Sequence, residues 1–289
     1  MPTYVARVAL YNFSLTDLPD GLKIESLVIL PKPESHLLRV RVNGIISNVT
    51  PVYPLTPDFL EIEYQSSLSE RWLLAEQWCK KVITLLRLFK DGSIFGHLRE
   101  VGNKDNPAER LLDEGAFGVP GLLMAPPPRI VTGRPDYTLC ASEVSPLAEH
   151  LQDLLTVDQS PFRIAIDRFN SSYERTDEVD RLIDLMVAFE ALFSEDPQAV
   201  GYKIALRCVM LLNDKPSQKE QDLRFLKGIY NRRSKIIHGK STEATKRECE
   251  KAENLLRRSI VKLLHLAKEG RVLSPENIDA FLFFEKRNF

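Results

Sequence analysis

Cysteine is scarce in this sequence, and its few copies are not arranged for metal binding or cross-linking. Four cysteines are spread over the 289 residues, and none belongs to a C-x-x-C pair. Zinc sites and disulfide frameworks draw on closely spaced cysteines, so the sequence predicts neither. We therefore expect no metal, no cofactor and a reducing compartment, for which the cytoplasm is the simplest choice.

Long apolar stretches are also missing. No uninterrupted run approaches the roughly 18 apolar residues that a membrane-spanning helix requires. The amino-terminal residues MPTYVARVALYNF lack the charged start and apolar centre of a secretory signal. The sequence thus predicts a cytoplasmic protein with no membrane partner.

Neither a phosphate-binding loop nor a strong net charge is present. The segment GAFGVPG is rich in glycine but matches neither G-x-x-x-x-G-K-[ST] nor G-x-G-x-x-G. The chain carries a net charge of −1, to which residues 1–200 contribute −10 and residues 201–289 contribute +9. Such asymmetry indicates either a basic working surface or a basic segment that packs against an acidic one, and the sequence leaves both open.

The periodicity of the apolar residues divides the chain into three regions and predicts the fold class α+β. Residues 1–65 are expected to be β-rich, because YVARVALYNF and LLRVRVNGII alternate apolar and polar positions. Residues 66–142 are expected to hold one long helix, with Trp72 and Trp78 in the core, and then an irregular connection rich in proline and glycine that includes APPPRIVTGRPD. Residues 143–289 are expected to form a helical bundle with LIDLMVAFEALF near its centre.

The stretch YNRRSKIIHGK places Arg233 and His238 at the end of a predicted helix that Gly239 stops. Histidine exchanges protons near neutral pH, and a guanidinium binds phosphate and stabilises the charge of a phosphorane. The two side chains suffice in principle for cleavage of RNA without a metal, because the substrate supplies its own 2′-hydroxyl as nucleophile. The ordinary alternative is a basic helix end that favours the macrodipole.

The R-x4-6-H spacing of this pair is not specific by itself. It recurs at Arg258 and His265, which lie seven positions apart on one face of a long predicted helix. Three further histidines, His36, His97 and His150, have no metal-ligand partner at a useful spacing. We expect these three to have no functional role.

The segments LIDLMVAFEALF, YKIALRCVMLL and IYNRRSKIIHG follow one another within residues 162–264. In their order and separation they resemble the Apea-like branch of the HEPN superfamily. HEPN domains are helical bundles, and many are metal-independent endoribonucleases whose R-x4-6-H motifs meet across a dimer interface. The resemblance therefore implies a homodimer in which Arg233 and His238 of both copies form one composite site.

The resemblance also implies roles for neighbouring residues. Glu190, in FEALF, is expected to face the site and to hold Arg233 or His238, either as a structural ion pair or in support of catalysis. Substrate contacts are expected from five basic and polar neighbours: Asn231, Arg232, Ser234, Lys235 and Lys240. A serine after the motif arginine departs from the Asn, Asp or His of many active members, although it is common in this branch.

The function implied is a metal-independent endoribonuclease that acts on single-stranded RNA, as an effector of a prokaryotic toxin, abortive-infection or antiviral system. The β-rich region would sense a trigger or protein partner, dimerise, or restrain the helical part. The alternative is a non-catalytic HEPN module that binds RNA, a nucleotide or a protein partner. A metal-dependent hydrolase finds no ligand cluster in the sequence.

Overall fold

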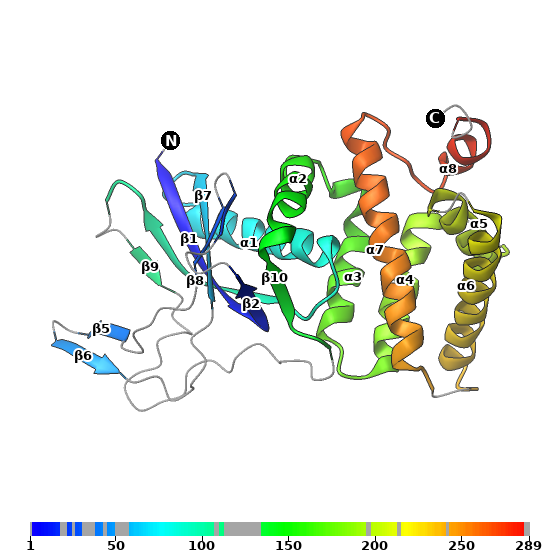
Figure 1. The fold of residues 1–289 in the computed structure, drawn as a ribbon, viewed down its shortest axis with the longest axis horizontal. Coiled ribbons are helices and arrows are strands. Elements are labelled where there is room, and N and C mark those ends of the chain that lie inside the picture. The colour runs from blue at the N-terminus through cyan, green and yellow to red at the C-terminus, as the bar shows by residue number, and fades with distance from the viewer. Residues whose placement is uncertain are drawn as a thin grey trace. The chain divides into compact units, whose positions relative to one another are not determined.

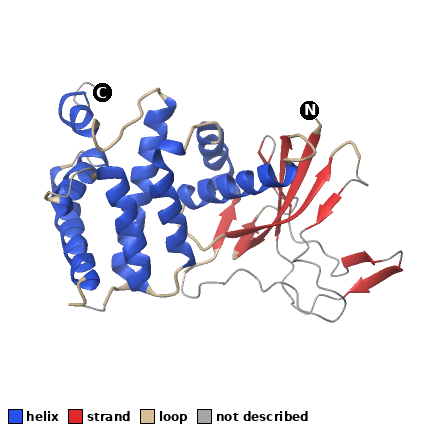
Figure 2. Cartoon of the chain, turned by 180° about the vertical axis from the view of Figure 1, so that it is seen from behind, coloured by secondary structure: helices blue, strands red, loops and turns tan. Residues whose placement is uncertain are grey.

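The computed structural model describes residues 2–17, 22–24, 27–30, 38–42, 45–49, 58–106, 110–112, 134–194, 198–212, 215–240 and 243–285 (Figure 1). The chain divides into two compact units. The first holds the strands, helix α1 up to Arg87 and the start of helix α2, and the second holds Leu88–Asp91 and the chain from His150 onward. In Figure 2 the described strands are red and belong to the first unit, and the second unit is built of blue helices. The mixed α and β fold class is thereby confirmed.

The main sheet of the first unit has six strands in the order β3–β4–β7–β1–β8–β9, and all neighbours run antiparallel. Strands β2 and β10 form a separate parallel pair, and β5 and β6 an antiparallel one. On β1, Tyr4, Ala6 and Val8 are buried at alternate positions, as the period of two predicts. The strand bounds are β1 Thr3–Tyr11, β2 Phe13–Thr16, β3 Leu22–Ile24, β4 Leu27–Leu30, β5 Leu38–Val42, β6 Ile45–Val49, β7 Asp58–Gln65, β8 Phe95–Asn103, β9 Arg110–Leu112 and β10 Tyr137–Cys140.

Helix α1, Arg71–Phe89, packs closely against strand β8. A Cβ on Gly96 would lie 2.7 Å from Cδ1 of Ile83, so the glycine permits this approach of strand and helix. The expectation that Trp72 and Trp78 are core residues is wrong, because both are half-buried and the Trp72 indole donates to Glu76 at 3.1 Å. Smaller side chains make the buried face of the helix: Ala75, Cys79, Val82, Leu85 and Leu86.

The chain after α1 contains strands, which corrects the prediction that residues 92–140 are irregular. Strand β8 pairs with β1, but the register shifts between Arg7 and Val8. This irregularity places the buried residues Leu98 and Val101 three positions apart, so the alternation that marks a strand is lost from the sequence. The glycine-rich segment 115–121 and residues 125–133 of the proline-rich segment lie outside the described residues.

The second unit is a set of packed helices, and its described residues from 198 to 285 contain no strand. Helix α4 contacts α3, α5, α6 and α7 and so occupies a central position. The helical bounds are η1 Ala141–Glu143, α2 Val144–Leu154, η2 Ser160–Phe162, α3 Arg163–Glu174, α4 Glu178–Phe193, α5 Val200–Leu212, α6 Pro216–Ile237, α7 Lys246–Lys268, α8 Ile278–Ala280 and a π-helical turn Phe281–Glu285. The helical prediction for this region is confirmed over the described residues.

Helix α4 forms the apolar centre of the second unit because its apolar residues recur at helical spacing. Asp177 caps its start and accepts hydrogen bonds from the N–H groups of Val179 and Asp180. The apolar face is fully buried: Leu182, Leu185, Met186, Phe189 and Phe193. The segment LIDLMVAFEALF therefore lies where its periodicity predicts.

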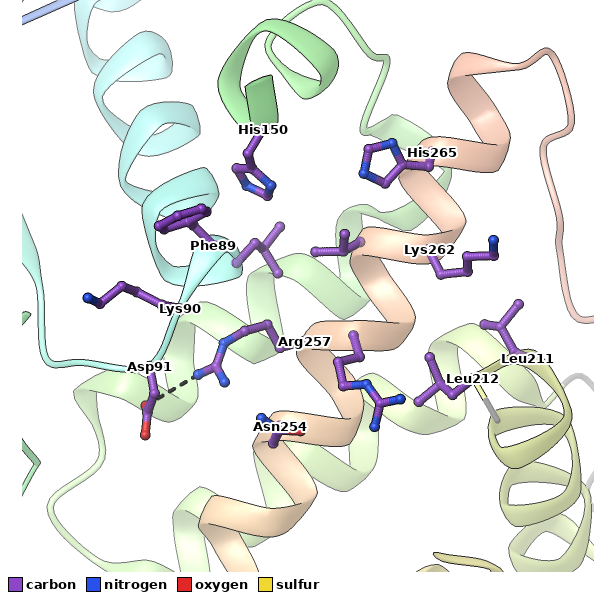
Figure 3. Close-up of a pocket in the computed structure, with 13 residues that line it drawn as sticks. Phe89, Lys90, Asp91, His150, Leu211, Leu212, Asn254, Arg257, Lys262 and His265 are labelled. Carbon is purple, nitrogen blue, oxygen red and sulfur yellow. Dashed lines mark hydrogen bonds and ion pairs between the residues drawn. The ribbon is translucent and has the colours of Figure 1, made fainter. Parts of the chain in front are cut away.

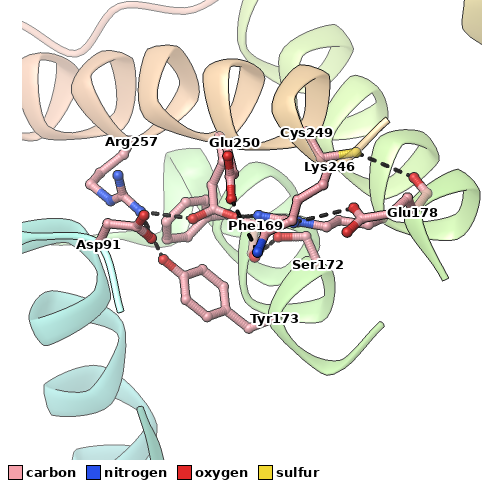
Figure 4. Close-up of polar contacts among 11 residues, drawn as sticks. Asp91, Phe169, Ser172, Tyr173, Glu178, Lys246, Cys249, Glu250 and Arg257 are labelled. Carbon is pink, nitrogen blue, oxygen red and sulfur yellow. Dashed lines mark hydrogen bonds and ion pairs between the residues drawn. The ribbon is translucent and has the colours of Figure 1, made fainter. Parts of the chain in front are cut away.

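A buried polar network ties helices α3, α4 and α7 together (Figure 4). Glu253 accepts hydrogen bonds at 2.8 Å from both Arg181 and Arg257. Arg257 also donates to the hydroxyl of Tyr173 at 2.9 Å and lies 3.3 Å from Asp91. The charges of Glu253 and of the two arginines are thus compensated inside the unit, which fixes how these helices pack.

Candidate functional site at the end of α6

Helix α6 carries the Arg233–His238 motif in its last turns. The helix ends at Ile237, and His238 follows with φ −88° and ψ 11°. Gly239 has φ +67°, in the left-handed region that glycine adopts at little cost, and its N–H donates to the carbonyl of Ile236 at 2.9 Å. The predicted glycine stop is confirmed, and it leaves the His238 side chain exposed at the helix end.

The Arg233 side chain is directed toward helix α4. Its Nη2 donates to Oε2 of Glu190 at 3.2 Å, and the two side chains are 22% and 25% exposed. Its Nε is buried and has no hydrogen-bond partner among the described residues. By contrast, Arg207 of α5 uses Nε, Nη1 and Nη2 in bonds to Asp279 and to the carbonyl of Phe193. Arg233 is thus held more loosely than a fully bonded structural arginine.

Tyr230 lies beside this pair and was not singled out by the sequence. The Arg233 guanidinium carbon is 6.0 Å from the centre of the Tyr230 ring. A Cβ on Gly201 of α5 would lie 2.4 Å from Cδ1 of Tyr230, so the ring packs directly on the α5 backbone. Burial raises the pKa of Tyr230, the negative charge of Glu190 raises it further, and Arg233 partly opposes this. The phenol therefore remains a proton-bearing neighbour of the Arg233–Glu190 pair.

The other predicted substrate-binding residues divide into two groups. Three of these side chains are exposed: Asn231, Lys235 and Lys240. Arg232 instead places its Nε 3.0 Å from Oε1 of Glu248 in α7, so it takes part in an ion pair between helices. Ser234 is half-buried, and its carbonyl accepts the N–H of His238 at 3.1 Å.

The structure brings Arg233 and Glu190 together, but it does not bring His238 to them within one chain. No hydrogen bond or ion pair joins His238 to either side chain in the part of the chain that the structure describes. Positions five apart on a helix differ by about 140° around the axis, which accounts for the separation. One chain therefore offers an arginine supported by a carboxylate and, apart from it, an exposed histidine.

Other chemistry-bearing groups do not form a competing centre. Among the described residues, no group of three or more His, Cys, Asp or Glu side chains is placed to hold a metal ion. All four cysteines are free, and burial raises the pKa of the Cys79 and Cys208 thiols to about 12. Over the same residues, no helix is both long enough and apolar enough to cross a membrane.

Two histidines outside the motif contribute to a pocket on helix α7. His150 and His265 line it together with Arg258, and Figure 3 shows both imidazoles at one end of the pocket. From the sequence, no role was expected for His150, and Arg258 and His265 were interpreted as a chance second occurrence of the R-x4-6-H spacing. Their common location was not visible in the sequence, because the lining residues come from four separate segments. His97 lies on β8 opposite Ala9, and His36 lies outside the described residues.

Comparisons with protein-family models, curated proteins and solved structures found no match to this chain. The geometry at the end of α6 and the motif spacing are therefore the basis for a functional proposal. Both concern described residues of the second unit, on helices α4 and α6.

Proposed function

We propose that this protein is a metal-independent endoribonuclease of HEPN type. The observation that carries the proposal is the pairing of Arg233 with Glu190 near a helix end where His238 is exposed. A partly exposed guanidinium suits a phosphate, and an exposed imidazole suits proton transfer. The exposed side chains of Lys235 and Lys240 add positive charge that attracts a phosphate chain.

The reaction is a transesterification within the RNA. The 2′-hydroxyl loses its proton, its oxygen attacks the adjacent phosphorus, and the bond from phosphorus to the 5′-oxygen breaks. The leaving 5′-oxygen takes up a proton, so the products are a 2′,3′-cyclic phosphate and a 5′-hydroxyl. His238 transfers a proton in this step, and Arg233 stabilises the negative charge that develops on the phosphoryl oxygens. Glu190 orients Arg233.

Two copies of the chain complete the site. Because Arg233 and His238 are separated around α6, one chain presents too few groups to one phosphate. A two-fold axis beside the end of α6 would place one chain's arginine near its partner's histidine, since a symmetric interface brings the same patch together twice. The resemblance to HEPN nucleases implies the same composite arrangement.

The biological setting is part of the proposal and rests on the resemblance alone. The protein would act as an effector in a prokaryotic toxin, abortive-infection or antiviral system and would cleave single-stranded RNA. The strand-rich first unit would sense a trigger or protein partner, dimerise, or restrain the nuclease.

A second candidate function is a non-catalytic HEPN module that binds RNA, a nucleotide or a protein partner. Two ion pairs favour it. Arg233 is engaged by Glu190 at 3.2 Å, and Arg232 is engaged by Glu248 at 3.0 Å. In this reading the arginines hold α4, α6 and α7 together, and His238 is an ordinary residue at a helix end.

Incubation of the purified protein with total RNA, with and without EDTA, separates the two functions. The nuclease should cleave RNA equally well with the chelator, leave cyclic phosphate ends and spare DNA, which lacks the 2′-hydroxyl. His238→Ala should lower the rate by roughly two orders of magnitude, the usual effect of a positioned acid or base.

Arg224→Ala is the matched control for Arg233→Ala in this assay. Arg224 lies on the same helix, is 79% exposed and pairs only locally with Glu220 among the contacts described. Arg233→Ala should abolish most activity and Arg224→Ala should retain it. Equal cleavage by wild type and His238→Ala would refute the site, and no cleavage of any RNA would favour the binding module.

A further inference from the structure

The outward face of helix α6 carries a row of exposed polar side chains that leads away from His238. Lys227, Asn231, Lys235 and His238 follow one another at intervals of three or four residues, the spacing of neighbours along one face of a helix. All of them are exposed, and we call them the α6 row. At 1.5 Å per residue, the row extends for about 16 Å along the helix axis.

The α6 row is positively charged. Lys227 and Lys235 supply the charge, and Lys240 follows shortly after the helix end. In the contacts among the described residues, neither Lys227 nor Lys235 is paired with a carboxylate. Toward the helix start, Arg224 pairs with Glu220, so these two charges cancel and the row ends at Lys227. Exposed cations in a line suit the successive phosphates of a nucleic acid strand.

An exposed aromatic ring stands beside the end of the α6 row that lies away from His238. Tyr202, in the first turn of α5, is 51% exposed, and the Lys227 ammonium lies 5.6 Å from the centre of its ring. Helices α5 and α6 lie side by side (Figure 1), and the preceding Gly201 packs closely against Tyr230 of α6. Tyr202 is therefore held in place next to the row, while half of its surface stays accessible.

A ring beside cations is the combination with which proteins bind single-stranded nucleic acid without reading its sequence. The bases stack on the ring, and the cations contact the phosphates. Stacking accepts every base, because every base has a π-face. An exposed tyrosine costs nothing in a soluble protein, but its location at the end of a row that begins at His238 connects it with the candidate site.

We infer that Tyr202 and the α6 row form the track on which single-stranded RNA lies, with one base stacked on Tyr202 and the strand passing along Lys227 to His238. The inference rests on the proposed ribonuclease function and adds where the substrate is held beyond the reacting phosphate. In a duplex each base is stacked between its neighbours, so only an unpaired strand can offer a base to Tyr202. The track therefore selects single-stranded RNA.

Fluorescence anisotropy with a labelled 2′-O-methyl oligoribonucleotide of about 12 nucleotides tests the track without cleavage, because the methyl group blocks the attacking 2′-hydroxyl. Tyr202→Ala should weaken binding by roughly tenfold, the effect of one lost base stack. The salt dependence should stay the same, since no charge is removed. Tyr202→Trp should restore the affinity, and Tyr202→Leu should not, because leucine is apolar but has no ring.

The matched control for Tyr202→Ala is Phe284→Ala. Phe284 is 78% exposed and lies outside the α6 row, so this variant should bind like the wild type. Lys227→Gln should lower both the affinity and the steepness of its salt dependence, the latter by roughly 0.7 for one phosphate contact. Lys262→Gln removes an exposed lysine of α7 and should change neither.

An oligonucleotide of the same length with abasic sites in place of its bases tests the stack from the side of the RNA. It keeps the phosphates, so the wild type and Tyr202→Ala should bind it equally. Equal affinity of these two proteins for the intact oligonucleotide, or full restoration by Tyr202→Leu, would overturn the inference. So would no binding by the wild type at about 100 µM, which would leave this face to a protein partner.

A measurement on the wild-type protein guards against variants that fail to fold. A 2′-O-methyl oligonucleotide that contains 5-iodouracil should cross-link to Tyr202 on irradiation, as identified by mass spectrometry of the peptides. Adducts only on aromatic residues outside α5 and α6, such as Phe284, would overturn the inference. Cleavage is measured separately on unmodified RNA, so binding that depends on Tyr202 but is followed by no cleavage would support the track and refute the nuclease.

Discussion

At the scale of single residues, the partial exposure of the Arg233–Glu190 ion pair bears on whether the pair serves function or only holds the fold together. Its two side chains are 22% and 25% exposed and are joined by one hydrogen bond of 3.2 Å. Partly solvated ion pairs contribute about 0–1 kcal/mol to folding, whereas breaking a buried pair costs about 3–5 kcal/mol. Stability measurements therefore show which kind of pair this is.

We predict that Arg233→Ala and Glu190→Ala each lower the free energy of unfolding by about 1 kcal/mol or less, because solvent can replace the lost partner. Urea denaturation of each variant, compared with the exposed control Arg224→Ala, measures this. A loss above about 3 kcal/mol for either variant would assign the pair to the structural framework. Activity that falls while stability is retained would support the catalytic role.

Contacts between individual residues could be predicted from the sequence only where they belong to a recognised motif. The contact of Arg233 with Glu190, 43 positions away, was expected from the resemblance. The pairing of Arg232 with Glu248 and the packing of Tyr230 on the α5 backbone were not, because the crossing of two helices decides which side chains meet. Spacing along one helix carries no information about that crossing.

At the scale of elements, the packing of α5 on α6 positions the candidate site. Gly201 lets α5 approach the Tyr230 ring, which lies one turn before Arg233. We predict that Gly201→Ala moves this ring and lowers the free energy of unfolding by about 1–3 kcal/mol, the usual cost of overpacking. The proposed ribonuclease activity should fall as well, because Arg233 lies against the displaced ring.

Gly228→Ala is the matched control, since it adds the same methyl group in the middle of α6. A Cβ at Gly228 would have no neighbour within 4 Å. Alanine favours a helix by about 0.5–1 kcal/mol over glycine, so this variant should be more stable than the wild type. Thermal and urea unfolding of both variants measure these changes in stability. Equal destabilisation by Gly201→Ala and Gly228→Ala would contradict the close packing of Gly201 on the Tyr230 ring.

Element types were predictable where the apolar period was regular. Helices α4, α6 and α7 follow a period of 3.6, and β1 follows a period of two over its first part. Strand β8 was missed because the register shift opposite Arg7 and Val8 breaks its alternation. The core position expected for Trp72 was wrong because smaller residues, such as Ala75 and Cys79, occupy the buried face of α1.

At the scale of the whole molecule, the distribution of charge agrees with where the candidate site at the end of α6 lies. Residues 201–289 carry +9, and they contain the Arg233–His238 motif. Each unit has its own apolar core, in the main sheet and around α4. The sequence predicted this division only coarsely, because strands from 95 to 103 and from 137 to 140 join the first unit.

The proposed composite site makes a prediction about assembly that a single side chain can test. Ile237 is 51% exposed and precedes His238 at the end of α6. We expect a two-fold dimer to cover this exposed apolar side chain. An aspartate substituted there would lose its water and would face the aspartate of the second copy, which is unfavourable. We predict that wild type is a dimer at micromolar concentration and that Ile237→Asp weakens dimerisation by roughly 30-fold or more, the effect of about 2 kcal/mol.

Ile164→Asp is the control for this prediction. It makes the same substitution at an isoleucine of α3 that is 58% exposed. It should leave both mass and cleavage unchanged. Sedimentation velocity across a concentration series gives the mass, and the RNA assay gives the rate for the same samples. If dimerisation creates the site, cleavage by Ile237→Asp should recover as protein concentration is raised and dimer returns, since the catalytic residues are intact. A monomeric wild type that cleaves RNA at full rate would show that one chain carries the whole site and would exclude the two-fold arrangement.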